Sequence, residues 1–192
     1  FTMMNFARLE VGVEGLALAE RAYQRALDFA KQRVQGREIG VKAGERVAII
    51  RHPDVRRMLM TMKAYSEAMR ALAAAAAEAL DHALASNDPD AKRRGQAKFD
   101  LLTPVVKGWC TELSTEIASL GVQVHGGMGF VEETGAAQHM RDARITSIYE
   151  GTTGIQANDL IGRKLAFEKG ATARAVIEEI RALDPVLAQH AT

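Results

Sequence analysis

Residues 53–84 read PDVRRMLMTMKAYSEAMRALAAAAAEALDHAL, and this stretch predicts the fold class. Pro53 suits the first turn of a helix, where its missing N–H group would be unpaired anyway, and Asp54 suits the positive end of the helix dipole. Apolar side chains then recur every three or four positions, at Val55, Leu59, Met62, Tyr65, Met69, Leu72, Ala76, Leu80 and Leu84. This spacing places them along one side of a single long helix, which we expect to end at the turn-forming residues 87–89.

The same spacing predicts further helices on both sides of this one. We expect long helices over residues 5–33 and 91–120, the latter with Gly121 as its cap. A fourth long helix should begin at Thr152 or Thr153 and reach residue 167, and shorter helical segments should cover residues 133–141 and 171–183. Residues 36–50 carry three glycines among charged residues and lack a helical period, so we expect a loop there.

No segment alternates apolar and polar residues with the period of two that a half-buried strand requires. Several long helices with one apolar stripe each are typical of an up-and-down bundle. The predicted fold is therefore all-α, an up-and-down four-helix bundle with additional short helices. We assign residues 1–168 to the bundle and residues 169–192 to a helical extension, and we expect the parent chain to continue beyond it.

The composition is that of a globular protein. The chain has 192 residues, of which 47% are hydrophobic and 26% charged, and its formal net charge is +1. This balance gives no global field that would attract a polyanion, so we expect no nucleic-acid partner. Charged residues interrupt every long apolar stretch, so we expect no membrane span. Cys110 has no partner for an internal disulfide and is expected in the core.

Two segments outside the helical pattern are candidates for holding an anion. Arg33 and Arg37 flank a glycine at the end of the first helix, and guanidinium groups pair bidentately with phosphate oxygens; alternatively, they only offset the helix dipole. Residues 123–130, QVHGGMGF, contain adjacent glycines whose backbone N–H groups can approach an anion closely; alternatively, they form a tight turn. Glu132 stands where a dinucleotide-binding fold needs its third glycine, so that fold is not indicated.

A third candidate site is residues 148–156, IYEGTTGIQ. Glu150 precedes a glycine and two threonines, so one interpretation is an ordinary charge at the start of a helix. It also follows the apolar pair Ile148 and Tyr149, and a carboxylate that loses water binds a proton more readily and becomes a usable base. The five histidines show no HExxH or similar ligand spacing, so we expect no metal site.

Taken together and in order, these segments resemble the C-terminal helical domain of the acyl-CoA dehydrogenases. The resemblance covers residues 5–165, and its most specific motifs are QVHGGMGF at 123–130, MRDARI at 140–145 and IYEGT at 148–152. The long loop before His52 is similar to the larger bacterial branch of the family that includes 3-methylmercaptopropionyl-CoA dehydrogenase. The chain departs from the family at Arg33-Val-Gln-Gly-Arg, where Arg-x-x-Phe-Gly is common, and at Asn5, which replaces an acid often found there.

The resemblance implies a flavoprotein that oxidises acyl-CoA to trans-2-enoyl-CoA, with Glu150 as the base that removes the α-proton while the β-hydrogen leaves as hydride to FAD. The backbone N–H of Glu150 would donate to the thioester carbonyl oxygen. Substrate contacts are implied at Asn5, Arg8 and Gly151. FAD contacts are implied at Arg33, Gln35, Gln123, Val124, His125, Gly126, Gly127, Thr152, Thr153 and Gly154.

The resemblance also implies an assembly and an electron acceptor. Arg33, Gln123 and the Gly126-Gly127 turn would reach FAD bound mainly by a neighbouring subunit, so we expect a homodimer or homotetramer. The expected acceptor is electron-transfer flavoprotein, and the expected location is the cytoplasm if the protein is bacterial, with the mitochondrial matrix as the alternative.

The family's N-terminal helical domain and middle β-domain are not in these 192 residues. We therefore expect one domain of a larger enzyme, inactive alone. The alternatives are an acyl-CoA oxidase, which passes electrons to oxygen, and a non-catalytic flavin-binding or scaffold relative.

Overall fold

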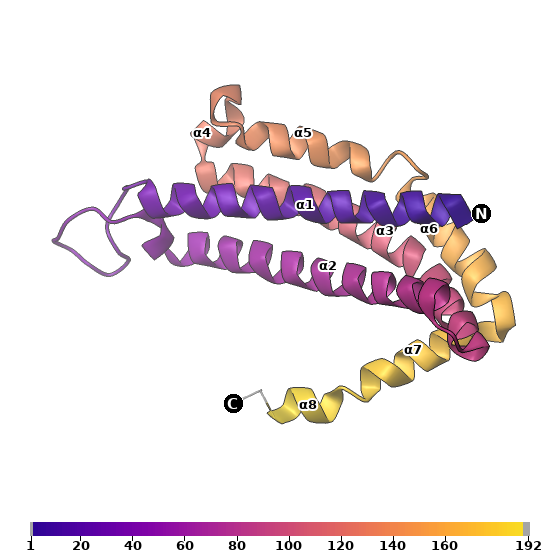
Figure 1. Cartoon of the computed structure of the whole chain (residues 1–192). Helices are drawn as coiled ribbons and strands as arrows, with labels where there is room; N and C mark the ends of the chain where they lie inside the picture. Colours follow the sequence, from indigo (N-terminus) through magenta and orange to yellow (C-terminus); the bar gives the residue numbers. More distant parts are fainter. Residues whose placement is uncertain (1, 190–192) are drawn as a thin grey trace.

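The computed structural model describes residues 2–189, in which three long helices and a shorter fourth one lie side by side (Figure 1). Helix α1 spans Thr2–Gln32, α2 spans Pro53–Ala85 and α3 spans Pro89–His125. Helix α5, Ala136–Thr146, packs on α1 and α3. Each of these helices runs opposite to the one before it, so the predicted all-α up-and-down bundle with additional short helices is confirmed.

The remaining elements are short and lie at the two ends of the bundle. Helix α4 is at the end where α1 finishes, and α6 is at the end where α1 begins, from which α7 and α8 extend (Figure 1). Their bounds are η1 Ile49–Arg51, α4 Gly127–Phe130, η2 Glu132–Thr134, α6 Thr153–Asp159, the π-helical turn η3 Leu160–Leu165, η4 Phe167–Gly170, α7 Ala171–Arg181 and α8 Asp184–Gln189.

The fourth helix of the bundle is not the predicted one. The long helix expected up to residue 167 is only the 7-residue α6, which passes into the π-helical η3. Its place in the bundle is taken by α5, which buries Ala136, His139, Ala143 and Thr146. The short helical segment predicted over residues 133–141 overlaps the first part of α5. The buried residues of α5 are small or polar, so the pattern of large apolar side chains did not indicate that this helix joins the bundle.

Helix α3 continues past Gly121, and the prediction that Gly121 caps this helix is wrong. The helix ends at His125, and Gly126 is the cap, with a φ of 61° that favours glycine. Gly121 instead lies against α1, where a Cβ atom would be 3.5 Å from the Ala22 carbonyl oxygen. Gly121 is thus a buried residue inside the helix, in ordinary packing distance of α1, and does not end the helix.

The core lies between α1, α2 and α3. Its fully buried side chains include Phe99, Met62, Met69, Ile117 and Val106, and the predicted burial of Cys110 is confirmed. Two members of the predicted apolar stripe of α2, Tyr65 and Leu84, lie exposed at the edges, as do Val13 on α1 and Trp109 on α3. No helix within residues 2–189 is long and apolar enough to cross a membrane.

Candidate functional site

Glu150 lies in the loop between α5 and α6, and its backbone conformation is unusual. Its φ is 54° and that of Gly151 is 90°, so two consecutive residues are left-handed. A residue with a side chain seldom adopts this conformation, which costs about 1–3 kcal/mol and persists only where the surroundings hold it. The loop therefore needs specific contacts to keep its shape.

Two buried side chains hold the backbone of this loop. Lys107, from the middle of α3, donates from Nζ to the Gly151 carbonyl oxygen at 2.7 Å. Gln156, from α6, donates from Nε2 to the carbonyl oxygens of Glu150 at 3.2 Å and Gly151 at 3.0 Å. The Gln156 Cβ atom lies 3.6 Å from the position that a Cβ would take at Gly108, so α6 packs directly on α3 at this point.

The residues on either side of the loop are tethered to the long helices as well. The Tyr149 hydroxyl donates to Glu14 on α1, and the Thr153 hydroxyl donates to Glu112 on α3. Burial and the Glu14 carboxylate raise the pKa of Tyr149 to about 12, so the phenol stays protonated at neutral pH. The loop is thus attached to the bundle before and after Glu150.

The Glu150 side chain and its N–H group are left available by these contacts. Glu150 is half-buried, and no group among residues 2–189 hydrogen-bonds to its carboxylate or to its backbone N–H. Thr152 and Gly154 follow it on the exposed surface at the start of α6. A free acceptor and a free donor therefore lie on one rigidly held residue.

The two predicted substrate residues on α1, Asn5 and Arg8, lie beneath this surface. Asn5 is buried and donates from Nδ2 to Asp100 on α3 at 2.6 Å. Arg8 is buried and forms an ion pair from Nη1 to Asp159 on α6 at 2.8 Å. Both side chains are bound to acidic residues of the bundle and hold α1 to its neighbours.

The predicted FAD residues of the other two motifs meet in one cavity. Arg33, Gln35 and the segment Gln123–Gly127 line a hollow of about 700 Å³ between the end of α1 and the end of α3. Open space surrounds the positions that Cβ atoms would take at Gly126 and Gly127. The Gly126 N–H already donates to the Gln123 carbonyl oxygen at 3.0 Å, so an anion in this cavity would meet the Gly127 N–H at the start of α4. The exposed Arg33 supplies a positive charge beside it.

The loop after α1 folds back to hold Arg33 and Gln35 in this cavity. An antiparallel bridge pairs Val34 with Ala48, and His52 Nε2 lies 2.7 Å from the Gln35 carbonyl oxygen. The sequence predicted only a loop for residues 36–50 and did not indicate this strand-like pairing.

The floor of the cavity is formed by two stacked rings. Phe29 and His125 lie 4.4 Å apart, centroid to centroid, and His125 Nδ1 is 2.7 Å from the Gly121 carbonyl oxygen. Burial lowers the pKa of His125, against the opposing effect of that hydrogen bond, so the ring is neutral at pH 7.

The predicted residues therefore fall into two groups at separate positions along the bundle. One group is the Glu150 loop beside α6, and the other is the cavity beside α4. Helix α3 connects them, and the 16 residues from Lys107 to Gln123 correspond to about 24 Å along its axis.

Sequence reasoning missed Lys107 and Gln156, which position the loop. A usable signal existed for Lys107: it lies next to Val106 and one turn before Cys110, on the apolar side of α3, where a lysine is uncommon unless paired. No comparable signal marks Gln156, because a polar residue early in a helix is ordinary.

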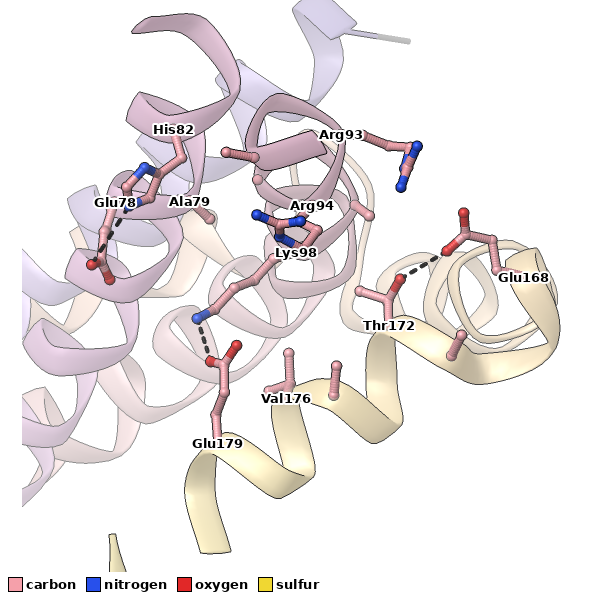
Figure 2. Close-up of a pocket in the computed structure, with 15 residues that line it drawn as sticks. Glu78, Ala79, His82, Arg93, Arg94, Lys98, Glu168, Thr172, Val176 and Glu179 are labelled. Carbon is pink, nitrogen blue, oxygen red and sulfur yellow. Dashed lines mark hydrogen bonds and ion pairs between the residues drawn. The ribbon is translucent and has the colours of Figure 1, made fainter. Parts of the chain in front are cut away.

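A separate groove of about 520 Å³ lies between α7 and the adjoining parts of α2 and α3 (Figure 2). Lys98 on α3 and Glu179 on α7 form an ion pair of 2.5 Å across it, and His82 lies on the α2 side. None of the predicted site residues lines this groove. It is therefore distinct from both groups described above.

Known proteins are similar to this chain in sequence and in fold. The sequence model described as acyl-CoA dehydrogenase, C-terminal domain, matches residues 1–165. The 3-methylmercaptopropionyl-CoA dehydrogenase of Ruegeria pomeroyi is 55% identical over 190 residues, which is 98% of this chain and 32% of that protein. A broad-specificity linear acyl-CoA dehydrogenase of Mycobacterium tuberculosis is 41% identical over 186 residues, 94% of this chain and 30% of that protein.

A solved structure gives the same picture. The butyryl-CoA dehydrogenase of Megasphaera elsdenii superimposes with a TM-score of 0.67 at 29% identity, covering 85% of this chain and 37% of that one. The chain thus spans about a third of the length of the relatives it matches.

Proposed function

The chain belongs to the acyl-CoA dehydrogenase family, as its C-terminal domain, and on this premise we propose that it supplies the catalytic base of an FAD-dependent acyl-CoA dehydrogenase. The observation that carries the proposal is Glu150, whose carboxylate and backbone N–H are both free on a loop that buried side chains hold. Removal of a proton next to a thioester needs both groups, a base for the proton and a donor for the carbonyl oxygen.

The chemistry assigns one task to each group. The Glu150 carboxylate takes the α-proton, and the electrons of that C–H bond form the α,β double bond. The Glu150 N–H donates to the thioester oxygen while negative charge develops there; loss of such a donor costs about 10²–10³ in rate. Bound FAD supplies the acceptor for the β-hydrogen and its electron pair. Gly151, next to the base, would face the substrate, and Thr152, Thr153 and Gly154 would line the flavin.

The cavity beside α4, at the end of the bundle where α1 finishes, supports binding of an FAD pyrophosphate. Arg33 offers a guanidinium group, and the Gly126-Gly127 turn has no side chains that would keep an anion from the Gly127 N–H. Gln35, Gln123, Val124 and His125 complete its lining. Because about 24 Å of α3 separates this cavity from the Glu150 loop, we assign the two to FAD molecules of different subunits, and hence the protein to a homodimer or homotetramer.

For Asn5 and Arg8 we propose a supporting role. Their side chains bind Asp100 and Asp159 inside the bundle, so they fix α1 against α3 and α6 beneath the loop. Any contribution to CoA binding would then come through the shape of this surface.

The names of relatives support the choice of substrate and acceptor. The 55% identical relative is named for 3-methylmercaptopropionyl-CoA, and others for butyryl-CoA and broad linear acyl-CoA substrates. A 28% identical relative of Acetobacterium woodii is a subunit of a caffeyl-CoA reductase-Etf complex, which supports electron-transfer flavoprotein as the acceptor. These relatives are bacterial, which supports a cytoplasmic location.

The test is flavin reduction in the full-length protein. We expect the purified protein to carry FAD. In the absence of oxygen, 3-methylmercaptopropionyl-CoA, butyryl-CoA or a longer linear acyl-CoA should reduce this flavin and bleach its absorbance. Rapid peroxide formation in air would indicate an oxidase instead. A flavoprotein that no acyl-CoA reduces would contradict the proposed activity and favour a non-catalytic relative.

A further inference from the structure

Lys107 is a fully buried lysine whose ammonium group is directed at the proposed catalytic loop. Its side chain has no exposed surface, and Nζ donates to the Gly151 carbonyl oxygen at 2.7 Å. Burial lowers the pKa of Lys107, and Arg8 adds to this, whereas Glu112 and Glu150 oppose it. A buried cation is costly unless it is paired, and lysines are seldom kept in such places for packing alone.

Gln156 supports the same segment from the other side. It is 2% exposed, and its Nε2 bonds to both loop carbonyl oxygens while its Oε1 atom is buried without a hydrogen-bond partner. The amide thus leaves its own acceptor unsatisfied, which is unfavourable, in order to donate to the loop.

The two donors act on consecutive peptide groups. The Glu150 carbonyl belongs to the peptide that joins it to Gly151, and the Gly151 carbonyl belongs to the next one. The two planes flank Gly151, so fixing them holds Gly151 at a φ of 90°. The first plane also fixes the carbonyl side of Glu150, and the bond from Tyr149 to Glu14 tethers the residue on its N–H side, so that Glu150 keeps its φ of 54°. Since the backbone conformation of Glu150 sets the direction of its Cα–Cβ bond and of its N–H, the same contacts aim the base and the donor.

We propose that Lys107 and Gln156 are positioning residues, which hold the Glu150–Gly151 peptides so that the carboxylate and N–H of Glu150 face the α-carbon and the thioester oxygen. This inference rests on the proposed function. Both side chains are buried and bond to the loop backbone, so they act through the loop. A displacement of about 1 Å at a reacting group can cost about a hundredfold in rate.

The test compares Lys107→Met and Gln156→Met in the full-length protein, with Lys98→Met as the matched control. Methionine keeps much of each side-chain volume and removes the donors. Lys98 lies on the same helix but pairs with Glu179, outside the loop. For both loop variants we expect kcat to fall by about tenfold to a hundredfold, with KM within about twofold and FAD content unchanged. The α-deuterium isotope effect on flavin reduction should rise, because proton removal becomes slower than the other steps. Lys98→Met should behave as the wild type.

Two results would overturn the inference. One is a wild-type kcat in either loop variant. The other is a fall in activity that only follows loss of bound FAD or of helical circular dichroism, which would make the residues merely structural; if this affects Lys107→Met alone, Gln156→Met decides. Wild-type protein that no acyl-CoA reduces, or Glu150→Gln that remains active, would instead refute the proposed function itself.

Discussion

The buried ion pair between Arg8 and Asp159 gives a sharp prediction about stability. Asp159 is 2% exposed and binds Arg8 at 2.8 Å and Arg163 at 3.0 Å, so one carboxylate serves two arginines. Asp159→Asn keeps the shape of the side chain but leaves the buried Arg8 without its counter-charge. Removing one partner of a buried pair costs about 3–5 kcal/mol, and the nearby Lys107 ammonium adds repulsion.

The reverse change should cost less. In Arg8→Met, Asp159 keeps its bond to the partly exposed Arg163, so we expect a loss of about 1.5–3 kcal/mol, the value of a hydrogen bond to a charged group. Urea unfolding of the 192-residue chain, followed by circular dichroism, measures both values. The reasoning fails if Asp159→Asn costs no more than Arg8→Met, or if either change leaves the unfolding midpoint where it was.

Three further predictions concern helix packing, the buried thiol and the proposed flavin cavity. Gly95→Ala should destabilise the chain by about 1–3 kcal/mol, because its Cβ would lie 2.7 Å from the Ala79 carbonyl oxygen, whereas Gly162→Ala meets open space and should be close to neutral in urea titrations. Burial raises the pKa of Cys110 to about 12, so Ellman's reagent should react with this thiol only after unfolding. The stability that the neutral thiol contributes should be complete below pH 9.0, the pKa of an unburied cysteine, and be lost as the pH rises through about 12. In the full-length protein, Arg33→Ala should weaken FAD binding by about tenfold or more in titrations, with little effect on the rate of flavin reduction. An unchanged affinity for FAD would contradict the proposed role of Arg33 in binding it.

Large apolar side chains at helical spacing were sufficient to predict α1, α2 and α3. They were not sufficient for α5, because its buried stripe consists of alanine, histidine and threonine, whose burial depends on the helices around them. Gly121 illustrates the same limit: a glycine that ends a helix, such as Gly126, and one that lies inside it, such as Gly121, look alike in the sequence.

The motifs around Glu150 and Gly126 were visible in the sequence, but their geometry was not. No local pattern predicts that Glu150, a residue with a side chain, is left-handed, since the conformation is maintained by Lys107 from 43 positions earlier and by Gln156. Likewise, Arg33 and Gln123 meet only because α1 and α3 end on the same side of the bundle.

The central claim is that Glu150 removes a proton from an acyl-CoA, and Glu150→Gln in the full-length protein tests it most directly. Glutamine keeps the shape of the side chain but cannot accept the proton. The rate at which acyl-CoA reduces the bound flavin is measured by rapid mixing without oxygen, and it should fall by about 10²–10⁴-fold. FAD content and helical circular dichroism should stay at wild-type values. Flavin reduction by Glu150→Gln at a rate near that of the wild type would contradict the claim.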